Sequence, residues 1–159
     1  VPQRLGCLLP DGLGRVIALA LGREGADVTV NYNASAGPAA DVVRALETLG
    51  RRAAALKADV AREDDVRALM DATLARFGRL DILVNNAGVM ARGAFLDVPI
   101  KDYEAMFAVN VTGTMLCTRY ALPGMIEAPH DMLISDDHHD YYRGKSLPIF
   151  PVESGGKAE

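Results

Sequence analysis

Two periods of apolar residues alternate along this chain, and they predict alternating helices and strands. Apolar residues that recur three and four positions apart predict helices at 14–24, 38–49, 64–77 and about 102–125. Short apolar runs between turn residues predict strands at 27–32 and 53–59, and another in the run that begins at Leu80. Strands that alternate with helices form a parallel sheet with helices on both faces. The pattern therefore predicts an α/β fold.

The same periodicity predicts which side of each helix is buried. In the first two helices the inward residues are expected to be Val16, Leu19 and Ala20, then Val43, Leu46 and Leu49. In the third they are Val66, Leu69, Met70, Thr73, Leu74 and Phe77. In the last they are Tyr103, Met106, Phe107, Asn110, Val111, Thr114, Met115 and Thr118. Residues 1–9 make a poor central strand, because they include Pro2, Gln3 and Arg4.

The run that begins at Leu80 ends in Asn85-Asn86-Ala87-Gly88. Ligands of open α/β sheets bind just beyond the carboxyl ends of the strands. The two amides can tie neighbouring strand ends together and still face a ligand, and the small residues after them leave room for a flat group. The alternative is an ordinary strand-ending turn, for which Asn and Gly are common residues.

The first predicted helix begins at a glycine pair, Gly12-Leu13-Gly14. Free backbone N–H groups and the positive end of the dipole make a helix N-terminus suitable for phosphate. An ordinary glycine-rich loop is the alternative. At the end of the second predicted strand, residues 31–35 lack a carboxylate that would bind a ribose 2′-hydroxyl. This favours a 2′-phosphate, although a polar surface turn explains the same residues equally well.

Four segments in the expected order resemble the short-chain dehydrogenase/reductase family, over roughly residues 12–126. They are Gly12-Leu13-Gly14, Asp59-Val60, Asn85-Asn86-Ala87-Gly88 and Val109-Asn110-Val111-Thr112-Gly113. The resemblance implies a Rossmann-like doubly wound parallel sheet, incomplete at the C-terminal side. It implies a dinucleotide-binding domain at 1–127 and an atypical, loop-rich tail at 128–159. The family has Thr-Gly where this chain has Cys7-Leu8, and the added bulk and the charge of Asp11 weaken the expected phosphate contact.

The implied activity is hydride transfer between a nicotinamide cofactor and a carbonyl or secondary alcohol, similar to 3-oxoacyl-carrier-protein reductases or sugar-alcohol dehydrogenases. NADP is the expected cofactor, with NAD as the alternative, and Arg15 is a weak candidate for holding its extra phosphate. The resemblance implies cofactor contacts by the following residues: Gly12, Leu13, Gly14, Asp59, Val60, Asn85, Asn86, Ala87 and Gly88. We add Asn31, which lies near the end of the second predicted strand.

The resemblance makes Asn110 the family's catalytic asparagine, which holds a water in the proton relay; a core asparagine that bridges backbone groups is the alternative. The family also uses a Ser on the substrate carbonyl, a Tyr that transfers the proton and a Lys that lowers the Tyr pKa. Ser135, Tyr141 and Lys145 are the candidates. On a helix, Tyr141 and Lys145 would share one face. However, Ser135 is unusually close to Tyr141, and Gly144 disfavours that helix, so a chance match is the alternative.

The composition and charge of the chain indicate which classes of partner it binds. The net charge of −4 and scattered cationic residues argue against nucleic acid and anionic membranes, and no apolar run approaches a membrane span. The expected ligand is a small molecule, and the start of the chain lacks the layout of a secretory signal, so we expect a cytoplasmic protein. Cys7 and Cys117 are far apart and are expected to be buried thiols.

The composition changes at about Ala128, where three histidines and several aspartates precede a Pro/Gly/Ser-rich end. A metal site there is conceivable, but the spacing favours a solvated acidic loop, and no metal is predicted. An intact middle between atypical ends suggests a truncated or partly frame-shifted product, which the coding DNA around residues 1–11 and 127–140 would test. The alternative function is a non-catalytic remnant that binds dinucleotide weakly, or associates with a partner through the helix at about 102–125.

Overall fold

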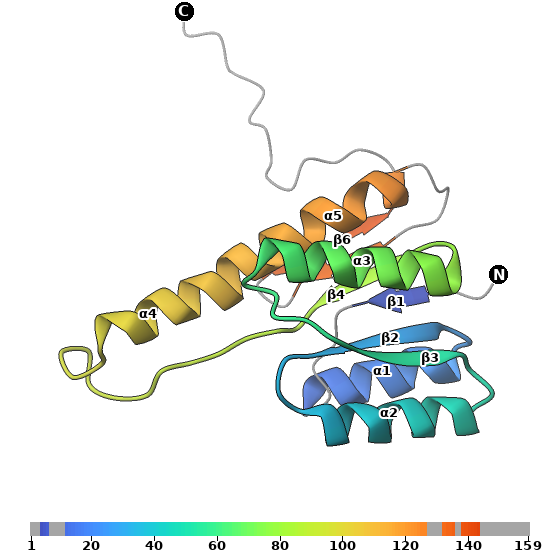
Figure 1. Ribbon diagram of the computed structural model, residues 1–159, viewed down its shortest axis with the longest axis horizontal. Coiled ribbons are helices and arrows are strands. Elements are labelled where there is room, and N and C mark those ends of the chain that lie inside the picture. The colour runs from blue at the N-terminus through green and yellow to red at the C-terminus, as the bar shows by residue number, and fades with distance from the viewer. Residues whose placement is uncertain (1–3, 7–11, 127–131, 136–137, 144–159) are drawn as a thin grey trace, which may run out of the picture.

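The sheet of this protein has six strands in the order β3-β2-β1-β4-β5-β6 (Figure 1). The computed structural model describes residues 4–6, 12–126, 132–135 and 138–143, with side chains for 12–126. The strands are β1 (Arg4–Gly6), β2 (Asp27–Tyr32), β3 (Ala53–Lys57), β4 (Ile82–Asn85), β5 (Met132–Ser135) and β6 (His138–Arg143). All neighbouring pairs are parallel except β5 with β6. The predicted parallel sheet is confirmed.

The helices lie on both faces of this sheet. They are α1 (Leu13–Arg23), α2 (Ala36–Thr48), α3 (Glu63–Phe77), α4 (Ile100–Met106) and α5 (Thr114–Ile126), with a π-helical segment, η1 (Phe107–Gly113), before α5. One core cluster joins α1 and α2 to β2 and β4, and a second joins α3 and α5 to β4 and the chain after β3. Figure 1 shows these pairs of helices on opposite sides of the sheet. The doubly wound arrangement is therefore confirmed.

The short strand β1 lies at the centre of the sheet, so the expectation that residues 1–9 make a poor central strand was wrong for residues 4–6. It pairs with β2 on one side and with β4 on the other. Strand pairing uses backbone groups, so three residues with unremarkable side chains are enough to bridge two stronger strands. The strand order reverses between β1 and β4, and such a switch point is where open α/β sheets bind ligands.

The buried face of α1 differs from the predicted one. Val16 is 63% exposed and Ala20 is also exposed, whereas Ala18 and two glycines, Gly14 and Gly22, are buried. A Cβ at Gly22 would collide with the side chain of Leu46 on α2. The two helices therefore pack through small residues, which an apolar periodicity does not detect.

The predictions for α2 and α3 were closer to the structure. In α2 the buried residues are Ala39, Val42 and Leu46, while the predicted inward residue Leu49 is 40% exposed. In α3 five of the six predicted residues are buried, and only Leu74, also 40% exposed, is not. Gly78 ends α3 in a left-handed conformation, with φ of 83°.

The predicted helix at about 102–125 runs from Ile100 to Ile126, interrupted by η1. Its inward residues were partly wrong, because Phe107, Val111 and Met115 are exposed. Thr118 is buried as predicted, and Gly113, Cys117, Ala121 and Met125, which were not among the predicted residues, are buried as well. The wider turns of η1 change the angular spacing of the residues, so an α-helical period mispredicts the buried side here.

The segment from residue 89 through α4 projects away from the sheet (Figure 1). Its tip is apolar, because Phe95, Leu96 and Ile100 are all exposed. Tyr103 fastens the tip to α4 by donating a hydrogen bond to the carbonyl oxygen of Phe95, and the two rings are in contact.

One expectation about the tail was wrong. Residues expected to form an acidic loop include β6, which pairs with β5, and β5 continues the parallel sheet beside β4. The domain boundary at 127/128 stays a prediction. Among the described residues, no helix is both long enough and apolar enough to cross a membrane.

Candidate functional site

The candidate site lies at the carboxyl ends of the parallel strands, beside the switch point between β1 and β4. On one side it is bounded by the N-terminus of α1. Gly12 has φ of 58°, and a Cβ there would meet no heavy atom within 4 Å. Glycine is therefore favoured at this position by backbone conformation rather than by space. The preceding residues, Cys7 to Asp11, lie outside the described residues.

Asn85 at the end of β4 points into the protein and anchors a helix. Its side chain is buried, and its Nδ2 donates a hydrogen bond to Oγ1 of Thr118 on α5, over 3.2 Å. Asn86 is half-buried, and Gly88 is exposed. Thr118 was predicted to face inward, but pairing it with Asn85 required the tertiary structure.

Asn110 clamps the backbone just after Gly88. Its Oδ1 accepts a hydrogen bond from the Val89 N–H, and its Nδ2 donates one to the Val89 carbonyl, each over 2.9 Å. The carbonyl oxygen of Asn110 itself accepts a hydrogen bond from the Thr114 hydroxyl, also over 2.9 Å. Asn110 thus bridges backbone groups, as the structural alternative expected, and its catalytic role stays a prediction.

The turn after β3 forms another wall of the site. Asp59 accepts a hydrogen bond from the Ala61 N–H through Oδ1, and the Asp59 N–H donates one to Oδ2 of Asp65 on α3, each over 3.0 Å. The second bond holds the pKa of Asp65 below its ordinary value, with a smaller contribution from the nearby Arg62 guanidinium. These bonds fix the conformation of the turn and the position of Val60.

Asn31 is directed toward β3. It is buried, and its Nδ2 donates a hydrogen bond to the Ala58 carbonyl over 3.0 Å and a longer one to the Leu56 carbonyl. Its amide nitrogen is therefore bound to the protein, and a contact with cofactor stays a prediction. Ser35 precedes the first turn of α2 without a side-chain capping hydrogen bond, and that turn has no acidic residue.

A small hollow that is partly open to solvent lies between some of these segments, and neither Gly12 nor Asn31 lines it. Its lining residues come from the turn after β3, the end of β4, η1 and α5: Val60, Asn85, Ala87, Gly113, Thr114 and Cys117. Cys117 is buried, as predicted. Gly113 is essential to the shape, because a Cβ there would lie 2.8 Å from Cγ2 of Val60.

Of the other predicted catalytic residues, the structure describes the backbone of Ser135 and Tyr141. Ser135 ends β5 and is paired in register with Asn85, so its backbone lies at the same edge of the sheet. Tyr141 lies in strand β6 and not in a helix, which agrees with the expectation that Gly144 disfavours a helix there. Lys145 lies outside the described residues. Among the residues whose side chains are described, no group of three His, Cys, Asp or Glu could hold a metal.

Comparison with known proteins places the chain among oxidoreductases of one family. The model of a family described as short chain dehydrogenase matches residues 9–135. The chain is 44% identical over 146 residues to an uncharacterized oxidoreductase of Methylorubrum extorquens, covering 92% of this chain and 57% of that protein. It is 38% identical over 119 residues to an L-rhamnose 1-dehydrogenase (NAD(P)(+)) of a Sphingomonas species, covering 75% and 47%. It is 37% identical over 124 residues to a 3-oxoacyl-[acyl-carrier-protein] reductase of Synechocystis, covering 78% and 50%.

Solved structures agree with the sequence relatives. A double mutant of a Serratia marcescens short-chain dehydrogenase/reductase superimposes with a TM-score of 0.79 at 33% identity, covering 84% of this chain and 54% of that one. A metagenomic blue fluorescent protein in complex with NADPH superimposes with a TM-score of 0.77 at 29% identity, covering 84% and 55%. The chain spans about half the length of the curated relatives it matches.

Proposed function

Because this chain belongs to the short-chain dehydrogenase/reductase family of oxidoreductases, we propose that it binds a nicotinamide dinucleotide for hydride transfer to or from a small carbonyl or secondary alcohol. One observation carries the proposal. Three segments that are far apart in the sequence, around Val60, Ala87 and Gly113, line one hollow at the strand ends. The small residues among them, Ala87 and Gly113, let a flat group approach the backbone at this edge of the sheet.

The proposed cofactor site uses Gly12, Leu13 and Gly14 for the phosphates, and the other predicted residues for the adenosine and the nicotinamide side. The N-terminus of α1 offers free N–H groups and a positive dipole end. The dinucleotide supplies the hydride acceptor or donor when bound. The residues of the chain bind and orient it, and Asn110 keeps the Val89 backbone in place.

NADP is the preferred cofactor in this proposal, and NAD the alternative. Residues 31–35 carry no carboxylate, and the first turn of α2 has no acidic residue. Nothing negative at this strand end therefore repels a 2′-phosphate. The NADPH complex of the blue fluorescent protein shows that a protein of similar fold holds this cofactor.

The proposed catalytic set is Asn110, Ser135, Tyr141 and Lys145. Ser135 would hydrogen-bond the substrate oxygen, Tyr141 would give or take the proton, and the ammonium of Lys145 would lower the Tyr pKa. The register of Ser135 with Asn85 supports the first assignment. The position of Tyr141 in a strand favours the second candidate function, a non-catalytic remnant that only binds dinucleotide or a partner.

We also propose that the chain forms a homo-oligomer through the helix at about 102–125. Phe107, Val111 and Met115 form an exposed apolar stripe on this helix. Exposed apolar patches of this kind commonly mark protein interfaces. A cytoplasmic location stays a prediction.

The test begins with fluorescence titration of the purified chain with NADPH and NADH, followed by an assay of carbonyl reduction. We expect saturable binding, tighter for NADPH. Turnover that is lost in Tyr141→Phe would support the enzyme, whereas binding without turnover would support the remnant. The absence of saturable binding at millimolar cofactor would refute both nucleotide-based functions.

A further inference from the structure

The turn after β3 holds both the backbone and the side chain of Asp59. The Asp59 N–H donates a hydrogen bond to Oδ2 of Asp65, and the Ala61 N–H donates one to Oδ1 of Asp59, each over 3.0 Å. The Asp59 carbonyl accepts a third bond from the Arg62 N–H, also over 3.0 Å. The remaining acceptor of Asp59, its Oδ2, has no hydrogen bond to any residue that the structure describes.

Asp65 is the partner that binds Asp59 through a side chain. It lies in the first turn of α3, and its carboxylate reaches back past the helix start to the Asp59 N–H. Its other oxygen, Oδ1, lies 3.4 Å from Nε of Arg62. The bond from the Asp59 N–H holds the pKa of Asp65 below its ordinary value, so Asp65 is ionised at neutral pH. A substitution of Asp65 therefore releases the Asp59 backbone without altering Asp59 itself.

The Asp59 side chain can distinguish between two purine bases. Asp59 is half-buried, and it precedes Val60, which lines the hollow at the strand ends. A carboxylate only accepts hydrogen bonds, so it favours a ligand group that donates them and disfavours one that accepts them. Adenine carries a donor, its 6-amino group, whereas hypoxanthine carries an oxygen acceptor at the same place. The distinction is sharp only if the carboxylate is held in one direction.

We infer that Asp65 is a positioning residue for base recognition: by holding the Asp59 N–H, it fixes the direction in which the Asp59 carboxylate selects adenine over hypoxanthine. This inference rests on the proposed function and adds the residue that would make the cofactor site selective for one base. Asp65 itself does not touch the base. Its effect passes through one backbone hydrogen bond, so it should change the selectivity between bases more than the overall affinity.

The first test compares two cofactors on the wild-type chain. NADPH and its deaminated analogue, reduced nicotinamide hypoxanthine dinucleotide phosphate, differ in the group at C6 of the purine. Fluorescence titration measures both dissociation constants. We expect NADPH to bind at least about 10-fold more tightly, the ratio that one hydrogen bond to a charged group supplies. Equal saturable binding of the two cofactors would overturn the inference and leave the proposed function intact.

Two substitutions of Asp65 separate its hydrogen bond from its charge. Asp65→Ala removes the acceptor, so the ratio of the two affinities should fall by at least about 3-fold. Asp65→Asn keeps an oxygen that accepts from the Asp59 N–H, so it should retain most of the ratio. A chain that is merely less stable would bind both cofactors more weakly at an unchanged ratio. An unchanged ratio in Asp65→Ala would overturn the inference, and so would an equal loss in both variants.

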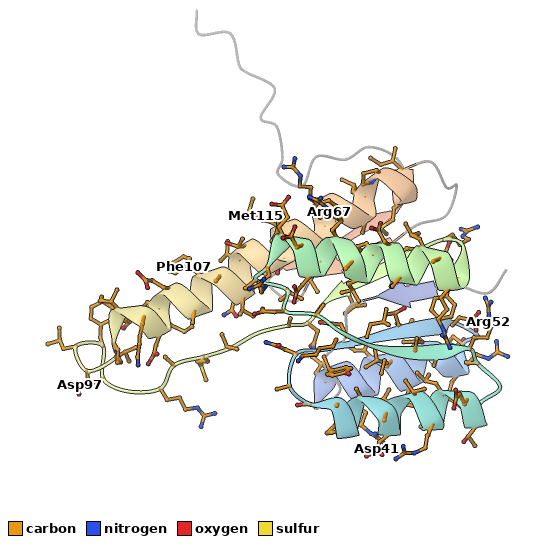
Figure 2. All side chains as sticks on the ribbon, in the orientation of Figure 1. Asp41, Arg52, Arg67, Asp97, Phe107 and Met115 are labelled. Atoms are coloured by element: carbon orange, nitrogen blue, oxygen red, sulfur yellow. The ribbon has the colours of Figure 1, made fainter. Side chains whose placement is uncertain are left out.

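Asp64→Ala is the matched control. Asp64 is exposed, lies in the same first turn of α3 and carries the same charge. Its carboxylate acts on Arg67, which binds Tyr120 and which Figure 2 shows on the side of α3 next to α5. The control should keep the wild-type ratio, and a fall as large as in Asp65→Ala would overturn the inference. If neither cofactor binds the wild-type chain, the proposed function and the inference both fail.

Discussion

Two amide side chains, those of Asn85 and Asn110, hold the candidate site together by bonding to the protein itself. Asn85 joins the end of β4 to α5 through Thr118, and Asn110 fixes the backbone at Val89. The sequence predicted that the amides of Asn85 and Asn86 could tie neighbouring strand ends together, whereas Asn85 binds a helix. It did not indicate their partners, because a hydrogen bond across 33 residues depends on how α5 packs.

Thr118→Val should destabilise the protein because the amide of Asn85 then loses its partner in a buried place. Leaving a buried donor unpaired costs about 1–3 kcal/mol. Urea unfolding of the variant measures this loss. Thr112→Val on the exposed side of η1 is the control, and equal stability of the two variants would contradict the role of the Asn85 bond.

Asp65 should give the protein an acid-sensitive contribution to stability. The hydrogen bond from the Asp59 N–H lowers the pKa of this carboxyl below its ordinary value of 3.8. A lowered pKa stabilises the folded state above pH 3.8, and the contribution is lost as pH falls through the folded value. The difference in Tm between wild type and Asp65→Asn should therefore shrink below that pH. A difference that stays constant from pH 6 to pH 3 would contradict this assignment.

At the scale of elements, η1 approaches the turn after β3 closely because Gly113 has no Cβ. A Cβ at Gly113 would lie 2.8 Å from Cγ2 of Val60 and 3.3 Å from its backbone oxygen. The sequence placed Gly113 in a family-like segment but gave no physical reason for a glycine there. The reason is that the helix and the turn touch.

Gly113→Ala should push η1 away from Val60 and cost about 1–3 kcal/mol of stability, because overpacking at a rigid contact is not relieved cheaply. Gly124→Ala in α5 is the matched control. A Cβ there meets no heavy atom within 4 Å, so alanine should stabilise this helix by about 0.5–1 kcal/mol. Chemical denaturation compares the two, and changes of the same sign would show that the Val60 contact is unimportant.

At the scale of the whole molecule, the dinucleotide should stabilise the fold, because its proposed site takes residues from segments that pack into both core clusters. At a concentration one hundred times Kd, a ligand adds about 2.7 kcal/mol. For a chain of this size that corresponds to a rise in Tm of about 5–10 °C. Differential scanning fluorimetry with NADPH and NADH measures the rise, and no shift with either cofactor at millimolar concentration would contradict the site.

The sequence by itself determined the alternating helices and strands between residues 13 and 126, the parallel sheet, and the position of the small and amide residues at the strand ends. These features depend on local periodicity and on turn chemistry, which a sequence carries directly. The tertiary structure alone decided that Gly22 and Gly113 are contact points, that Phe107, Val111 and Met115 face outward, and that Tyr141 lies in a strand. These features depend on which surfaces meet and on the one wide helical turn at η1, and no local period encodes either.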